Sequence, residues 1–279
     1  MHVTRDPTGA SSEMRIAIAG FGAIGRAVAS RIAAGSVPRA AVTAVSARDC
    51  SRAAAAAALI DGRIVVCAVE ALSDHADIVV ECAPAELFAD IATPFLIAGK
   101  CVIVLSVGAL LQRPELVDLA RAHGGRLLVP TGALLGLDAV AAAAVGEVSL
   151  VRLVSRKPVA ALQGAPWLVK NGIDISAISE ATRVFAGSAR EAAAGFPANI
   201  NVAAALALAG VGPDRTQVEI WADPALTRNV HQIVVESDAA HLDMRIENIP
   251  SANPRTGRIT AQSVIALLRK HGSALCVGT

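Results

Sequence analysis

The 279-residue chain has almost no net charge and no long apolar run free of charged residues. Its 25 Lys and Arg nearly balance 24 Asp and Glu, so no overall positive field would attract nucleic acid or an anionic membrane surface. A membrane-spanning helix needs about 18 or more consecutive apolar residues, and no apolar segment reaches that length. We therefore expect neither nucleic acid nor a membrane as a partner. The 54% of hydrophobic residues is expected to fill a folded core instead.

The cysteine and histidine residues show no pattern typical of a metal centre. The five cysteines form no CxxC pair and no Cys/His cluster. The histidines form no metal-ligand spacing, so we expect no bound metal. Free thiols are typical of a reducing compartment, and we expect a cytoplasmic protein. The first 13 residues are polar and lack the apolar centre of a signal peptide, which predicts a disordered tail over residues 1–13.

From residue 14 to residue 131, short apolar runs alternate with helix-length stretches. Helices are predicted at residues 24–34 and in the alanine-rich run 53–58, since alanine is the best helix former. Continuous Val, Ile and Leu runs separated by helices are typical of a parallel sheet covered on both faces. The predicted fold class is therefore α/β, with a Rossmann-type, doubly wound parallel sheet. Its strands are expected at residues 15–19, 41–45, 64–67, 78–81, 101–105 and 126–129.

The pattern of apolar and polar residues changes near residue 132. Apolar runs at residues 148–154, 218–221 and 232–236 are separated by turn residues and predict a mixed or antiparallel sheet. We therefore expect a dinucleotide-binding domain over residues 14–131 and a second, α+β domain over residues 132–250, which carries the substrate site and the oligomer contacts. Helical spacing at residues 260–271 predicts that residues 251–279 form a C-terminal helix that returns to the first domain.

A glycine-rich motif follows the first predicted strand and opens the first predicted helix. It contains the expected cofactor contacts Gly20, Gly22, Ala23, Ile24 and Gly25. The first glycine permits a tight turn, the second lets a pyrophosphate approach the backbone, and the third lets helix and strand pack closely. Helix-terminal amides and the helix dipole then hold the phosphates. The motif predicts binding of NAD or NADP; the alternative is a tight turn used only for packing.

Further cofactor contacts are expected at the carboxyl ends of later strands, where open α/β sheets bind ligands. The second strand runs into Ser46 and Arg48, which suit the 2′-phosphate of NADP, whereas Asp49 is displaced from the position where an acid would bind the ribose of NAD. Either cofactor is therefore expected, and a plain surface charge is the alternative for Arg48. Ser106 and Gly108 follow another strand and leave room for a nicotinamide ring.

Several further blocks, in order along the chain, resemble the L-aspartate dehydrogenase family. Besides the glycine motif they are residues 106–110, 130–139, 157–158, 196–204, 222–224, 231 and 247–248. The resemblance extends from about residue 14 to the carboxyl end. It implies NAD(P)-dependent oxidation of L-aspartate to iminoaspartate, which hydrolyses to oxaloacetate and ammonia or enters NAD biosynthesis through quinolinate. It also implies a homodimer or a larger homo-oligomer.

The same resemblance implies roles for individual residues. His231 matches the catalytic histidine of the family. Ala133 and Asn201 match positions that contact the cofactor, with Asn199 as the close rival of Asn201. Leu135 stands where the family usually has glycine, so the exact substrate stays open.

The chemistry of amine oxidation fits these assignments. The substrate ammonium must lose a proton before hydride leaves, and histidine suits that step because its pKa is normally about 6.5. His231 is the expected proton carrier, and Lys157, Asn199 and Thr131 are the expected partners of a dicarboxylate substrate. Two alternatives remain: another imine or amino-acid oxidoreductase of dihydrodipicolinate-reductase-like architecture, and an NAD(P)-binding redox sensor without turnover.

Overall fold

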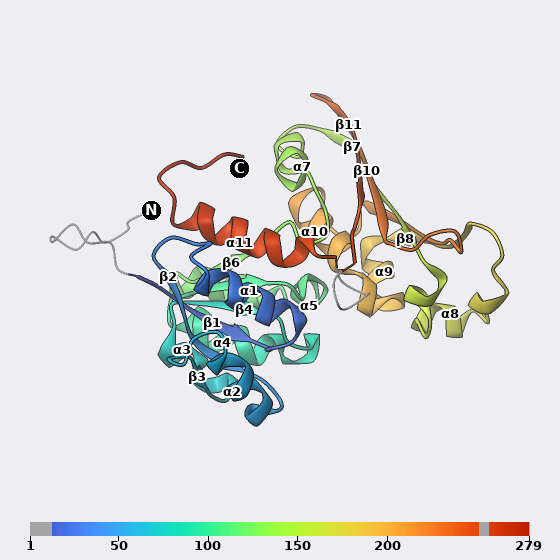
Figure 1. Cartoon of the computed structure of the whole chain (residues 1–279). Helices are drawn as coiled ribbons and strands as arrows, with labels where there is room; N and C mark the ends of the chain where they lie inside the picture. The colour runs from blue at the N-terminus through green and yellow to red at the C-terminus, as the bar shows by residue number, and fades with distance from the viewer. Residues whose placement is uncertain (1–12, 251–256, 279) are drawn as a thin grey trace. The chain divides into compact units, whose positions relative to one another are not determined.

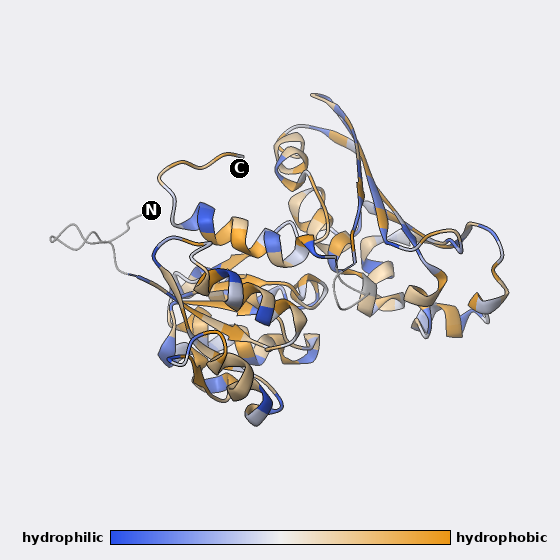
Figure 2. Cartoon of the chain, in the orientation of Figure 1, coloured by the Kyte–Doolittle hydropathy of each residue, from blue (hydrophilic) through white to orange (hydrophobic). Residues whose placement is uncertain are grey.

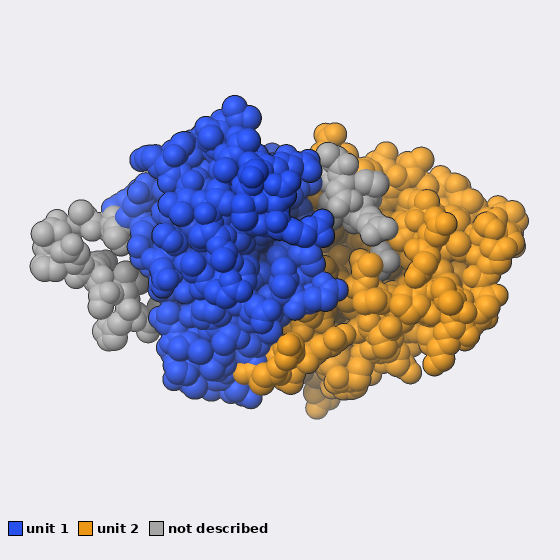
Figure 3. Space-filling model, turned by 90° about the horizontal axis from the view of Figure 1, so that it is seen from below, with its two compact units in different colours: residues 1–103, 116–128 blue, residues 104–115, 129–279 orange. Residues whose placement is uncertain are grey.

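A computed structural model of the chain describes residues 13–250 and 257–278, apart from the side chain of Asn199. The described residues form two compact units (Figure 3). The first contains the residues up to Ile103 together with Leu116–Leu128; the second contains Val104–Glu115 and the residues from Val129 onward. No helix within the described ranges is long and apolar enough to cross a membrane.

The first unit is built on a six-stranded sheet with the order β3-β2-β1-β4-β5-β6 (Figure 1). Strand β1 pairs in parallel with both β2 and β4, which is the arrangement of a doubly wound fold. The strands are β1 (Met14–Ala19), β2 (Ala40–Ser46), β3 (Val65–Val66), β4 (Ile78–Glu81), β5 (Cys101–Val104) and β6 (Arg126–Leu128). The helices are α1 (Ala23–Ala33), α2 (Cys50–Ala58), α3 (Leu72–His75), α4 (Phe88–Ile97) and α6 (Glu115–His123).

The strands of this sheet are apolar because helices cover both of its faces. Figure 2 shows hydrophobic residues concentrated along them, and the last four residues of β1 are fully buried. A half-exposed sheet would alternate apolar and polar residues instead. The predicted fold class and all six predicted strands are therefore confirmed, and the alanine-rich run 53–58 lies within α2.

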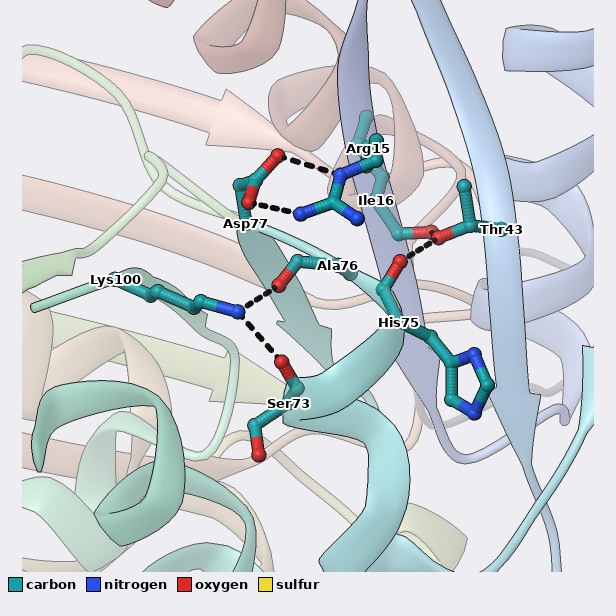
Figure 4. Close-up of polar contacts among 8 residues, drawn as sticks. All are labelled: Arg15, Ile16, Thr43, Ser73, His75, Ala76, Asp77 and Lys100. Carbon is teal, nitrogen blue, oxygen red and sulfur yellow. Dashed lines mark hydrogen bonds and ion pairs between the residues drawn. The ribbon is translucent and has the colours of Figure 1, made fainter. Parts of the chain in front are cut away.

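Polar contacts fix the amino-terminal ends of these strands (Figure 4). The Arg15 guanidinium donates to both carboxylate oxygens of Asp77, which joins the start of β1 to the residue before β4. The Lys100 ammonium, next to β5, donates to the carbonyls of Ser73 and Ala76 at 2.6 and 2.9 Å. These contacts join β1, α3, β4 and β5 at the amino-terminal ends of the strands. In open α/β sheets, ligands bind at the opposite, carboxyl-terminal ends.

The second unit carries a five-stranded sheet with the order β11-β10-β7-β9-β8. It is mixed, as predicted, because β7 and β9 are parallel while β10 is antiparallel to both β7 and β11. Its strands are β7 (Val148–Lys157), β8 (Thr182–Ser188), β9 (Thr216–Ala222), β10 (Val230–Ser237) and β11 (His241–Glu247). Its helices are α5 (Val107–Leu111), α7 (Leu137–Ala143), α8 (Pro166–Lys170), α9 (Ala189–Gly195), α10 (Asn201–Ala209) and α11 (Ile259–His271).

The division of the chain differs from the expected one in two places. Residues 104–115, from the last residue of β5 to the first residue of α6, group with the second unit rather than with the rest of residues 14–131, and α11 groups with the second unit too. The local contacts explain both: α5 is held to α10 through a backbone amide, and Ser263 of α11 accepts a hydrogen bond from the amide of Gly132. Residues 1–12 of the predicted tail and residues 251–256 lie outside the described ranges.

Candidate functional site

The glycine motif forms the turn between β1 and α1, and each glycine has a distinct steric environment. Gly20 has φ +93°, and a Cβ there would lie 2.6 Å from the carbonyl carbon of Cys82. A Cβ on Gly25 would overlap the carbonyl oxygen of Gly20, whereas one on Gly22 would meet nothing within 4 Å. The first and third glycines are thus required by packing, and the second leaves open space beside the backbone. This is the pattern that a pyrophosphate requires.

The amino end of α1 is suited to an anion. Gly22 is its N-cap residue, and no side chain caps the first turn, which includes Ala23, Ile24 and Gly25. Backbone amides at an uncapped helix start and the positive end of the helix dipole attract phosphate groups. The residues present therefore fit the dinucleotide that the motif predicts.

A cavity of about 870 Å³ lies next to this turn, within the first unit. It is bounded by the glycine turn, the end of β2, the start of α2 and the segment after β4. Ser46 and Arg48 line it, as expected for residues that follow the second strand. Asp49 also lines it, but its carboxylate accepts a hydrogen bond from the Arg52 amide at 2.9 Å and caps α2. Sequence reasoning missed Arg26 and Arg52, which line the same cavity from the two helices.

Two of the predicted cofactor segments meet in the second unit. The Gly108 amide donates to Oδ1 of Asn201 at 3.0 Å, and a Cβ on Gly108 would overlap the Ile200 side chain. Asn201 does not cap α10, whose N-cap residue is Ile200 without a side-chain hydrogen bond. Because an amide N–H can only donate, this contact fixes the orientation of Asn201 and turns its NH₂ group away from Gly108. Ser106 lies just before α5 and is largely buried.

The turn that contains Thr131 and Ala133 is held in the second unit by side chains far along the chain. The Gly132 amide donates to Oγ of Ser263 at 3.1 Å, and Nδ2 of Asn248 donates to the Ala133 carbonyl at 2.9 Å. Thr131 is exposed beside them. Leu135, the residue that differs from the family pattern, packs against the hydrophobic core of this unit, where its bulk is accommodated.

His231 and Lys157 lie on the buried face of the second sheet. Ser155 pairs with His231 across β7 and β10, and its Oγ lies 3.0 Å from Nδ1 of the imidazole. Lys157 is two residues further along β7 and therefore on the same face as Ser155. Ser155 and His231 are each 2% exposed and Lys157 is 4% exposed. Sequence reasoning missed Ser155, although its place two residues before Lys157 in an alternating strand is a usable signal.

Burial dominates the electrostatics of this cluster. It lowers the pKa of Lys157 from 10.5 to about 8, because a buried ammonium loses its hydration. The pKa of His231 falls from 6.5 to about 3, first through burial and second through the positive charge of Lys157. The imidazole is therefore neutral at ordinary pH, and its second nitrogen, Nε2, is the one not engaged by Ser155.

The described residues contain no cluster of three or more His, Cys, Asp or Glu side chains that would hold a metal ion. The cavity beside the glycine turn and the cluster around His231 belong to different units. The first has the features of a dinucleotide cradle, and the second has a neutral histidine beside a cationic lysine. A hydride-transfer enzyme requires a cofactor site, a proton acceptor and a positive charge from its protein, and each of these is present within one of the two units.

Comparisons with known proteins agree with this chemistry. A family described as "Aspartate dehydrogenase, C-terminal" matches residues 138–271, and one described as "Homoserine dehydrogenase, NAD binding domain" matches residues 20–130. An L-aspartate dehydrogenase of Bradyrhizobium diazoefficiens is 55% identical over 97% of this chain and 96% of its own length. L-aspartate dehydrogenase 3 of Bordetella bronchiseptica is also 55% identical, over 96% of this chain and 98% of its own.

Solved structures show the same fold. The crystal structure of aspartate dehydrogenase from Thermotoga maritima matches with a TM-score of 0.73 and 28% identity, covering 95% of this chain and 99% of that one. A scyllo-inositol dehydrogenase from Lactobacillus casei matches with a TM-score of 0.54 and 18% identity, covering 92% and 86%. The second similarity concerns the fold alone.

Proposed function

This chain belongs to the L-aspartate dehydrogenase family, and on that premise we propose that it oxidises L-aspartate to iminoaspartate with NAD or NADP as the hydride acceptor. The observation that carries the proposal is the glycine turn, where packing requires Gly20 and Gly25 while Gly22 is open to a ligand. Similarity to curated L-aspartate dehydrogenases over nearly the whole chain supports the choice of substrate.

The bound nicotinamide supplies a carbon that accepts hydride from the substrate Cα. The chain has to orient that ring and exclude water from it. In this proposal the uncapped start of α1 binds the pyrophosphate, while Ser106, Gly108, Ala133 and Asn201 border the nicotinamide half. Asn201 supports this role because its NH₂ group is turned away from Gly108 and is oriented as a donor.

His231 takes the proton that the substrate ammonium must lose. For this, Nε2 must be unprotonated, which requires that Nδ1 carries the hydrogen and donates it to Oγ of Ser155. Ser155 is then a positioning residue that fixes both the ring and its tautomer. The resulting imidazolium is unfavourable in the free protein, because burial and the charge of Lys157 hold the pKa of His231 at about 3.

Binding of the substrate raises the low pKa of His231. A carboxylate bound near Lys157 offsets the lysine charge, and a carboxylate within about 4–6 Å of a cationic group raises its pKa by roughly 1–3 units. L-Aspartate carries two carboxylates, so it raises the basicity of His231 more than an amino acid with one. We assign Lys157 and Thr131 to carboxylate binding, together with Asn199, whose side chain lies outside the described part of the structure.

The oligomeric state and the cellular compartment of the protein are also part of this proposal. We assign the chain to a homodimer or a larger homo-oligomer, as the family resemblance implies, and to the cytoplasm. The location is supported by the free thiols of Cys50, Cys67, Cys82, Cys101 and Cys276 in the described residues, since a reducing compartment keeps such groups unpaired. Light scattering of the purified protein measures the assembly.

The test is the absorbance of reduced cofactor with L-aspartate, L-alanine and other amino acids, with NAD and NADP in turn. We expect turnover with L-aspartate and much less with L-alanine. His231→Ala should lower kcat by about a hundredfold to ten-thousandfold while cofactor affinity is retained, as for loss of a general base. Undiminished turnover in His231→Ala removes the assignment of the base. Tight cofactor binding without turnover on any amino or imino acid supports a redox sensor instead, and turnover only on a cyclic imine supports an imine reductase.

A further inference from the structure

Three arginines line the cavity beside the glycine turn, each from a different part of the first unit. Arg26 comes from α1, Arg48 from the loop after β2 and Arg52 from the first turn of α2. All three arginines are exposed to solvent. Within the described residues none of their guanidinium groups has an ion-pair or hydrogen-bond partner.

Several arginines elsewhere in the described residues are paired with a carboxylate. Arg15, Arg63, Arg121 and Arg190 each contact a carboxylate at 2.6 or 2.7 Å. Arg26, Arg48 and Arg52 all line this one cavity, and none of them has such a partner among the described residues. Arginine binds phosphate through two parallel N–H donors, so a cluster of this kind is suited to an anionic phosphate.

The acid in this cavity has another role. Asp49 is the one acidic residue among its lining, and Oδ1 of Asp49 accepts from the Arg52 amide at 2.9 Å as the N-cap of α2. An NAD-specific site instead places a carboxylate at the end of the second strand, where it accepts from the ribose hydroxyls. That position is held here by Ser46, the last residue of β2.

Ser46 adds a hydroxyl to the same site. It is 5% exposed and lines the cavity, and its side chain has no hydrogen-bond partner among the described residues. A hydroxyl is a neutral group that can donate a hydrogen bond to a phosphate oxygen. The end of β2 thus presents a neutral donor and two cationic groups where an NAD-specific protein presents an acid.

We infer that this cavity contains a binding site for a phosphate monoester, formed by Ser46, Arg48 and Arg52 with Arg26 close by, and that the chain consequently prefers NADP to NAD. The inference rests on the proposed function, because it takes the cavity to hold the adenosine half of the cofactor. Ser46, Arg48 and Arg52 then select between the two cofactors, and Asp49 takes no part in binding the ribose.

The experiment uses two small nucleotides that lack nicotinamide, titrated calorimetrically into the full-length protein. Adenosine 2′,5′-bisphosphate carries the 2′-phosphate, and AMP is otherwise identical. We expect the bisphosphate to bind about tenfold or more tightly than AMP, the gain expected from one or two charge-assisted hydrogen bonds. The advantage should shrink as salt is added, because exposed charges are screened. Equal affinities for the two nucleotides overturn the inference.

Variants locate the site. Arg48→Ala and Arg52→Ala should each reduce the ratio of bisphosphate to AMP affinity by about tenfold. The matched control is Arg31→Ala, an exposed arginine in the last turn of α1 that does not line the cavity. An unchanged ratio in both Arg48→Ala and Arg52→Ala contradicts the inference even if the wild-type protein prefers the bisphosphate.

Asp49→Asn tests the role of the acid. Asparagine caps helices as well as aspartate does, so this variant keeps the fold and removes only the charge. We expect unchanged NAD affinity and equal or tighter NADP affinity. A tenfold loss of NAD affinity would show that Asp49 reads the ribose and would overturn this part of the argument.

The outcomes separate this inference from the proposed function. If AMP and the bisphosphate bind equally while L-aspartate still reduces NAD, the phosphate site is wrong and the function stands. If neither nucleotide binds, the cavity does not hold a cofactor, and both the inference and the assignment of the cradle fail.

Discussion

Replacing Lys157 by methionine should make the protein more stable and much less active. Lys157 is 4% exposed, and burial alone lowers the pKa of its ammonium from 10.5 to about 8. A pKa difference of one unit is worth about 1.4 kcal/mol, so the folded state disfavours the charged form by about 3 kcal/mol. Methionine keeps most of the apolar stem and removes the charge.

The sign of the pH dependence follows from the two pKa values. The folded protein releases this proton near pH 8, whereas the unfolded chain retains it up to about 10.5. Between these values the unfolded state binds more protons, so the free energy of unfolding rises with pH by up to about 3 kcal/mol. Below about pH 8 both states are charged and the penalty is fully present. At neutral pH, Lys157→Met should therefore have a larger free energy of unfolding than the wild type. Its free energy of unfolding should not show the rise with pH that the wild type shows.

Urea unfolding followed by circular dichroism, from neutral pH to about pH 10, measures both effects. The gain is less than 3 kcal/mol to the extent that favourable interactions of Lys157 in the folded protein are lost in the variant. The matched control is Lys170→Met at an exposed site, which should change stability by less than about 0.5 kcal/mol. If Lys157→Met unfolds at a lower urea concentration than the wild type at every pH, the buried ammonium stabilises the fold. That result would refute the argument that its burial lowers stability.

The remaining predictions concern Ser155 and the glycine turn. Ser155→Ala leaves Nδ1 of a buried imidazole without its partner and should lower the free energy of unfolding by about 1–3 kcal/mol. It should reduce kcat more than it raises KM, while Ser149→Ala, an exposed serine on the same strand, should change neither. Gly25→Ala should lower the melting temperature because its methyl group overlaps a backbone carbonyl. Gly22→Ala should melt like the wild type yet bind NADH more weakly by fluorescence titration, and equal melting temperatures for the two glycine variants would contradict the steric argument.

The sequence predicted the features that depend on local pattern. The six strands of the first sheet follow from continuous apolar runs, and the glycine motif lies between β1 and α1 as its spacing requires. In the second unit, β7, β9 and β10 were predicted from alternation, whereas β8 and β11 were not. In β11, exposed residues alternate with half-buried ones, and no residue is fully buried. The strand therefore has no fully buried face that its sequence could indicate.

The contacts that build the site could not be predicted, because they join distant parts of the chain. Ser155 and His231 are 76 residues apart, and only the register between β7 and β10 places them together. The contact between Gly108 and Asn201 spans 93 residues. Asp49 illustrates a different limit: its displacement from the ribose position was visible, but its role as a helix cap required the geometry of α2.

The buried face of β7 shows where the requirements of folding and function diverge. Val151 and Leu153 on this face are 1% and 0% exposed and pack in the hydrophobic core, and the next two residues of the same face are Ser155 and Lys157. Two further apolar residues would continue the core without burying a charge, and replacement of buried ionic groups by well-packed apolar ones is often stabilising. The chain instead places a lysine with a lowered pKa beside a histidine held neutral, at the end of a strand. Local rules of this kind are broken mainly at functional positions, so the unfavourable burial of Lys157 is itself an argument that this end of the sheet binds the substrate.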